Sequence, residues 1–217
     1  MKRYFIFDKF NTWYDWRLIL TAKDIPDAEP KTNYVALDGM SGTLDLSEAL
    51  TGEITYEDRT ITATFWTDSG TRTEREKLLR NIRSALHGKK VKIIEPDDPD
   101  HYFLGRVKIK SSKNIIPYAE ITIEAVCDPW RYATDKTVRI IKVNDQTIDA
   151  VIRNNGVKTI CPNIDVTGEV TLIYNGIETE LITGTYKIPS IKFKQGVSVL
   201  SVSGNGSVLL TYEEADL

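Results

Sequence analysis

The sequence contains few of the residues on which most protein chemistry depends. Its 217 residues include only two cysteines, Cys127 and Cys161, and two histidines, His87 and His101. No further histidine or cysteine stands at metal-ligand spacing from any of these four. Serine, histidine and aspartate do not occur together around a nucleophile elbow either. We therefore expect no enzyme, no metal site and no cofactor.

The chain also lacks long apolar runs and an excess of charge. Its N-terminal apolar stretch is too short for a signal peptide, and no stretch approaches the ~20 apolar residues of a membrane helix. We therefore expect synthesis in the cytoplasm and no membrane association, with both cysteines free and packed as small apolar groups. The 28 Lys and Arg nearly balance the 31 Asp and Glu, for a net charge of −3. The basic excess of nucleic-acid-binding proteins is missing, so we expect no stable nucleic-acid binding.

Most of the sequence alternates between apolar and polar residues, which is typical of β-strands. The clearest runs are residues 60–65, 103–110 and 120–125. The last two runs flank a turn-rich connector, residues 111–117, and this order predicts an antiparallel hairpin. Pairing would bring lysines of one strand near glutamates of the other, a favourable cross-strand arrangement. These residues are Lys108, Lys110, Glu120 and Glu124.

One segment departs from this rhythm and predicts a helix of about four turns. Thr73–Glu76 resembles a capping box, and Gly88 stands where a glycine often ends a helix. The apolar positions between them form one stripe for burial against a sheet. They are Leu78, Leu79, Ile82, Ala85 and Leu86.

Beyond residues 127–132 the helix signals vanish, and short strands alternate with tight turns. Asn175-Gly176 predicts a two-residue hairpin turn. Residues 197–212 repeat the pattern, with a turn expected at Ser203–Gly206. Short strands at this spacing are typical of a β-sandwich. We therefore expect two domains, residues 1–132 and 133–217, in a mainly β protein with one main helix in its α+β N-terminal domain.

Three features are candidates for a site. The acidic segment Glu95–Asp100 has the chemistry of a Ca²⁺ site, but its prolines favour a solvated hairpin tip. Trp13 and Trp16 fit a buried core or a subunit interface better than a sugar platform. The expected helix carries a basic surface that includes Arg75 and Arg83. This surface either meets an acidic partner or is a solvated face with pairs such as Glu76 to Arg80. We keep Trp13, Trp16, Arg75 and Arg83 as candidate interface residues.

The order and spacing of many short motifs resemble one protein family. In the first domain these motifs are Trp13–Trp16, Leu18–Pro26, Glu29–Thr32, Asp38–Ser47, Arg59–Ile61, Leu86–Gly88, Val91–Ile94, Tyr102–Val107 and Ala125–Pro129. In the second domain they are Cys161–Gly168 and the ending Leu200–Gly206 through Tyr212. Together they resemble the distal tail proteins of siphophages and prophages of Gram-positive bacteria. One departure is Gly39-Met40-Ser41-Gly42, where the family often has a Gly-Arg-Asp-Gly turn.

The resemblance implies an architecture and a setting. The N-terminal domain is then a β-sandwich or split barrel that forms a homohexameric ring, and the C-terminal domain is a galectin-like β-sandwich. The ring acts as a baseplate hub at the tail tip of the virion. It joins the tail tube protein to the tail-tip or tail-associated lysin protein and to baseplate or receptor-binding proteins.

Two other functions compete with this one. The galectin-like half would be an adhesion module if it bound carbohydrate of the host cell wall. Sugar sites place an aromatic face beside several polar side chains. Tyr174 and Tyr186 are the residues to test, although neither has an obvious Asn, Arg and His set beside it. A wall hydrolase is the third reading, and no nucleophile, metal set or isolated acid pair supports it.

Overall fold

A computed structural model describes residues 4–217 of the chain. The chain divides into two compact units, Met1–Arg131 with Leu217 and Tyr132–Asp216, and each has its own apolar core. The expectation of a mainly β protein with one main helix is confirmed, since the part of the chain described contains a single helix. No helix in residues 4–217 is long and apolar enough to cross a membrane.

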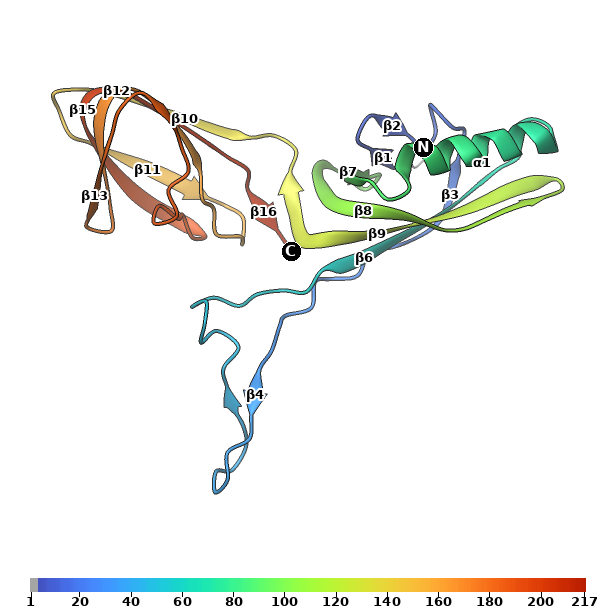
Figure 1. Ribbon diagram of the computed structural model, residues 1–217, viewed down its shortest axis with the longest axis horizontal. Helices are drawn as coiled ribbons and strands as arrows, with labels where there is room; N and C mark the ends of the chain where they lie inside the picture. Colours follow the sequence, from blue (N-terminus) through green and yellow to red (C-terminus); the bar gives the residue numbers. More distant parts are fainter. Residues whose placement is uncertain (1–3) are drawn as a thin grey trace. The chain divides into compact units, whose positions relative to one another are not determined.

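The first unit is built on one mostly antiparallel sheet (Figure 1). Its strands lie in the order β2-β1-β7-β8-β9-β6-β3. Their bounds are β1 Ile6–Phe7, β2 Phe10–Asn11, β3 Ile19–Asp24, β6 Arg59–Thr67, β7 Lys90–Glu95, β8 Asp98–Ile115 and β9 Tyr118–Ala133. Alternate residues of β6 and β9 face the core, as the sequence predicts. Ile61, Ala63, Phe65, Ile121 and Ile123 are all at most 3% exposed.

The helix α1, Arg72–Leu86, covers one face of this sheet (Figure 1). Leu79, Ile82 and Leu86 bury their side chains in the same core as the sheet residues, which confirms the apolar stripe. The helix starts earlier than Thr73–Glu76 predicts. Thr71 is the N-cap, and its hydroxyl accepts from the Glu74 N–H at 3.3 Å while the Thr71 N–H donates to Glu74 Oε2 at 2.6 Å. Thr71–Glu74 has the same spacing as Thr73–Glu76, and only tertiary placement distinguishes them.

The predicted hairpin exists, and its strands are longer than expected. Lys110 Nζ lies 2.9 Å from Glu124 Oε2, which confirms that cross-strand pair and lowers the pKa of Glu124. The prediction of a connector over residues 111–117 is wrong, because β8 continues to Ile115 and the turn is only Ile116-Pro117. Asn114 explains the extension. Its amide donates to the Arg72 carbonyl at 2.8 Å and to Glu76 at 3.0 Å, so this part of β8 is bonded to α1.

The second unit is all β, and buried side chains from its strands form one core. The main path of its sheet is β10-β15-β12-β13, with β11 paired to β15 and β14 paired to β12. The bounds are β10 Thr137–Asn144, β11 Ile148–Asn154, β12 Asn163–Tyr174, β13 Ile177–Leu181, β14 Gly184–Tyr186 and β15 Gly196–Tyr212, and β16 Ala215–Asp216 pairs with β9. Asn175 and Gly176 join β12 to β13 with φ of 51° and 77°, which confirms the predicted tight turn.

The predicted turn at Ser203–Gly206 is wrong, because β15 runs unbroken through these residues. The two glycines of this stretch let the backbones of β15 and β12 approach closely. A Cβ on Gly204 would lie 2.5 Å from the Glu169 carbonyl oxygen of β12, and one on Gly206 would overlap the Thr167 carbonyl. Glycine inside a strand often marks such a contact, so the pattern that predicts a turn here has a second meaning.

Candidate functional site

The segment between β3 and β6, residues 26–58, is the least buried part of the first unit, and we call it the arm. None of its residues is buried. Its apolar side chains are open to solvent, with exposed fractions of 58% for Tyr34, 48% for Leu37, 44% for Met40, 42% for Leu44 and 100% for Leu50. Apolar groups gathered on one exposed segment are typical of a contact surface.

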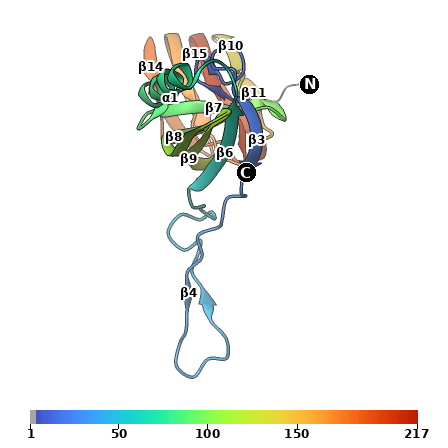
Figure 2. The same cartoon turned by 90° about the vertical axis from the view of Figure 1, so that its right-hand side faces the viewer.

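Backbone hydrogen bonds join the outgoing and returning segments of the arm into a two-stranded ribbon (Figure 2). At its base the Lys31 N–H donates to the Thr55 carbonyl at 2.7 Å and the Glu57 N–H to the Glu29 carbonyl at 2.8 Å. Further out, β4 Tyr34–Val35 pairs with β5 Leu44–Asp45. An isolated two-stranded ribbon with no core has little stability of its own. A partner that covers its apolar side chains would therefore stabilise it.

A buried arginine anchors the arm where it meets the sheet. Arg59 is 3% exposed, and its guanidinium donates to the Pro26 carbonyl at 3.4 Å and to the Pro129 carbonyl. Arg59 and Arg131 both lie over the ring of Phe103, with Cζ to ring-centre distances of 5.4 and 5.3 Å. Burial, and then the charge of Arg131, lowers the pKa of Arg59. Arg59 thus joins the two ends of the arm to each other and to the sheet.

The alternating patterns that predict the strands do not reveal the arm as a contact surface. The signal was present, because about thirty residues there lack a long alternating run, and structureless connections of that length are uncommon in compact domains. Such long connections are often functional or bind a partner.

The four predicted interface residues fall into two groups. Trp16 is 8% exposed and stacks on Phe10 with ring centres 5.2 Å apart. Arg75 is 5% exposed and donates to the Gly70 carbonyl at 2.7 Å and to Asn114 Oδ1 at 3.2 Å. Both side chains are therefore used inside the unit.

The other two reach the surface. Trp13 is half-buried with the Arg17 guanidinium 5.4 Å from its ring centre, and Arg83 is exposed and donates to Ser112. The structure does not bring the four residues together as one site. The interface hypothesis thus keeps Trp13 and Arg83.

The acidic segment Glu95–Asp100 contains the β7–β8 turn, and three of its four carboxylates are paired with cations. Lys23 Nζ contacts Glu95 and lies 2.8 Å from Asp97 Oδ2, and Arg131 lies 3.2 Å from Asp98. Burial acts to lower the pKa of Lys23, but the hydrogen bonds to Asp97 and Glu95 outweigh it and raise that pKa. Over residues 4–217, no group of three or more His, Cys, Asp or Glu side chains is placed to hold a metal ion.

The histidines make structural contacts. His87 Nδ1 accepts a hydrogen bond from the Ile109 N–H at 3.1 Å, and His101 Nδ1 lies 2.8 Å from Asp98 Oδ1. The tyrosines chosen to test sugar binding make similar contacts. Tyr174 is 8% exposed and donates to the Lys192 carbonyl at 2.5 Å, and Tyr186 donates to the Ile182 carbonyl at 3.0 Å. Tyr174 is a core residue, so its replacement would test stability and not sugar binding.

Comparison with known proteins adds a full-length structural likeness. No family model and no curated protein sequence matches the chain. Among solved structures, it is similar to the Dit protein (gp 19.1) of phage SPP1 with a TM-score of 0.75 and 14% sequence identity over 100% of both chains. That protein is described as a paradigm of the hub adsorption apparatus in phages that infect Gram-positive bacteria. The two chains thus share a fold from end to end.

Proposed function

We propose that this chain is a structural subunit of a phage tail tip or baseplate, as the resemblance of its motifs implies. The observation that carries the proposal is the end-to-end likeness to the SPP1 Dit protein, which includes both units. In this proposal residues 1–132 form a homohexameric ring. Residues 133–217 are a galectin-like docking module for baseplate or receptor-binding proteins. The ring joins the tail tube to the tip protein.

The arm is a second observation in favour of ring formation. A closed ring of identical subunits needs a head-to-tail contact between two different surfaces of one chain. The arm offers one such surface, with Leu37 and Leu44 available to pack on the next subunit. Burial of apolar area there would contribute about 25 cal/mol per Å².

The overall charge of the chain is also compatible with a ring through which DNA passes. A ring at the end of a tail tube lets DNA pass, and strong binding to its phosphates would hinder that passage. A net charge of −3 with no basic excess is compatible with such a channel.

Light scattering after size-exclusion chromatography, with negative-stain imaging, tests the proposal at micromolar concentration. We expect rings of six times the 24.6 kDa subunit mass, alone or with a tail-tip protein. The double variant Leu37→Asp/Leu44→Asp should prevent assembly and leave the circular-dichroism spectrum of the folded subunit unchanged, because neither residue is buried. The matched control is Val138→Asp/Ile140→Asp on β10, whose side chains are 51% and 64% exposed.

Two results would count against the proposal. One is a chain that stays monomeric alone and with tail-tip partners. The other is loss of assembly in the β10 control with none in the arm variant, which would move the contact surface from the first unit to the second.

A further inference from the structure

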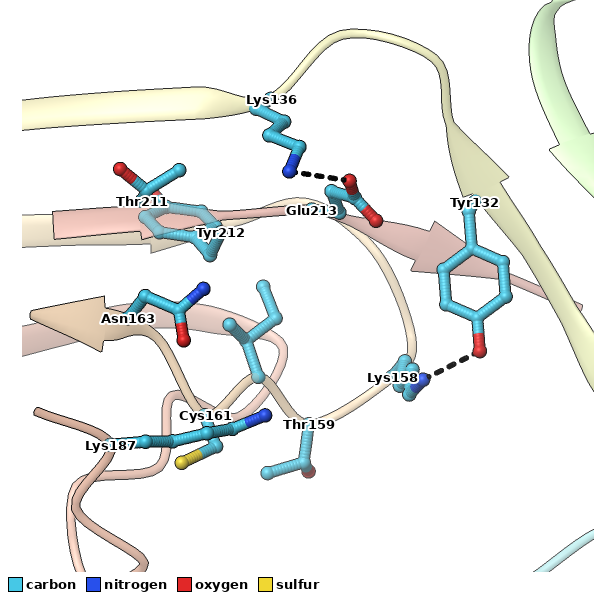
Figure 3. A pocket seen from close by; sticks show the side chains of 11 residues that line it. Tyr132, Lys136, Lys158, Thr159, Cys161, Asn163, Lys187, Thr211, Tyr212 and Glu213 are labelled. Carbon is cyan, nitrogen blue, oxygen red and sulfur yellow. Dashed lines mark hydrogen bonds and ion pairs between the residues drawn. The ribbon is translucent and has the colours of Figure 1, made fainter. Parts of the chain in front are cut away.

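A pocket of about 340 Å³ opens at one end of the second unit. Figure 3 shows side chains that enter it from separate segments: Tyr132 from β9, Lys136 before β10, Lys158 and Cys161 between β11 and β12, and Lys187 after β14. Its volume lies within the range of small-molecule sites.

The lining is cationic, with three lysines and one carboxylate. Lys136 Nζ lies 3.4 Å from Glu213 Oε1 (Figure 3). Lys158 Nζ donates to the Tyr132 hydroxyl at 2.9 Å and lies 4.4 Å from the ring centre. Within residues 4–217, Lys187 makes no hydrogen bond or ion pair. An anion would therefore meet an excess of ammonium groups.

The walls of the pocket are held in place before any ligand arrives. Tyr212 is 4% exposed, and its hydroxyl donates to the Arg153 carbonyl at 2.9 Å. Ile160 and Phe193 exchange backbone hydrogen bonds of 3.0 and 2.8 Å, and Cys161 Sγ lies 3.4 Å from the Ile188 carbonyl oxygen. These contacts fix the walls, and a pocket whose walls are already formed loses less entropy when it binds.

We propose that this pocket binds a phosphate ester of a hydroxylated compound, a polyol or sugar phosphate. Lysine ammonium groups bind phosphate oxygens through charge-assisted hydrogen bonds. Thr159, Thr211 and Asn163 also line the pocket and offer the hydroxyl and amide groups that recognise ligand hydroxyls. A compact pocket of this size suits such a unit better than an acidic peptide, which is usually bound along a groove or a sheet edge. The inference does not depend on ring assembly.

Isothermal titration of the full chain with glycerol 3-phosphate, inorganic phosphate and glycerol tests the inference. We expect saturable binding of glycerol 3-phosphate that is at least about fivefold tighter than that of inorganic phosphate, with none for glycerol. Lys187→Gln should weaken binding about fivefold or more at an unchanged melting temperature, because one charge-assisted hydrogen bond is lost. The matched control Lys142→Gln, an exposed lysine of β10 outside the pocket, should bind as the parent does.

Further titrations distinguish the source of the ligand and its chemical class. A polyol-phosphate polymer that binds more tightly per repeat than the monomer would indicate a surface polymer, and equal binding would indicate a free phosphate ester. Three results would overturn the proposal: no saturable binding of glycerol 3-phosphate, equal loss in Lys142→Gln and Lys187→Gln, or tighter binding of an acidic peptide. Lys136→Gln provides a second variant if Lys187→Gln lowers the melting temperature, and unaltered binding in it would also overturn the proposal.

Discussion

Gly105 on β8 lies directly against the thiol of Cys127 on β9. A Cβ at position 105 would overlap the sulfur atom and lie 2.9 Å from the Val126 carbonyl oxygen. The two strands approach closely at this point because residue 105 has no side chain. Cys127 is 1% exposed, and its sulfur occupies the space that a larger residue at 105 would need.

Gly105→Ala is therefore expected to lower the free energy of unfolding by about 1–3 kcal/mol through overpacking. Cys127→Ala removes the sulfur and should cost about 1 kcal/mol by itself. The double variant should lose less than the sum of the two, because the new methyl group takes the place of the sulfur. Urea denaturation of the four proteins measures this coupling, and strict additivity would contradict the contact.

The two cysteines are expected to differ in reactivity. Burial, and then the charge of Asp128, raises the pKa of the Cys127 thiol to about 12, so it stays protonated and unreactive at pH 8. Cys161 is half-buried and free. A thiol reagent at pH 8 should label one cysteine per folded chain and two in urea, and Cys161→Ser should abolish labelling of the folded chain. Labelling of that variant at the same rate as the parent would show that Cys127 is accessible.

The ion pairs of Lys23 are expected to stabilise the β7–β8 turn. Lys23→Met leaves Glu95, whose side chain is 8% exposed, without this cation. We expect a loss of about 1–3 kcal/mol, below the range for fully buried pairs, because the Lys23 side chain is 25% exposed. Lys31→Met is the matched control, since the Lys31–Glu57 pair is 3.6 Å long and exposed, and its effect should be under about 0.5 kcal/mol. Equal effects in chemical denaturation would refute this role of Lys23.

The start of α1 can be tested by two threonine substitutions. Thr71→Ala removes the side chain that accepts from the Glu74 N–H and should cost about 1 kcal/mol. Thr73→Ala, two residues later, removes no cap and should have little effect. Thermal unfolding followed by circular dichroism compares the two. A larger effect of Thr73→Ala would restore the capping box expected from the sequence.

The parts of the fold that were predictable are those in which one local pattern has one structural meaning. Alternation in β6, β8 and β9 determines which residues are buried, since successive side chains of a strand face opposite sides. The apolar stripe of α1 and the Asn175-Gly176 turn are equally local. The pattern Ser203–Gly206 is compatible with a turn or with a close backbone contact. The position of Glu169 on the neighbouring strand β12 shows that it is a close contact.

The candidate sites were less predictable than the fold. Arg75 and Arg83 lie in similar sequence surroundings, but their environments differ. Arg75 is buried and bonded to Asn114 and the Gly70 carbonyl, whereas Arg83 is exposed. The lysine-lined pocket gave no local signal, because Lys136, Lys158 and Lys187 stand far apart in the chain.

The sequence by itself determined the mainly β character, the single main helix, the buried faces of the strands and the near neutrality of the chain. These properties follow from residue type and short-range periodicity. Only the tertiary structure decided that residues 26–58 form an unburied arm, that Lys23 pairs with Glu95 and Asp97 of the acidic turn, and that three lysines line one pocket. The ion pairs and the pocket depend on segments that are distant in sequence and adjacent in space, and adjacency of that kind has no local signature.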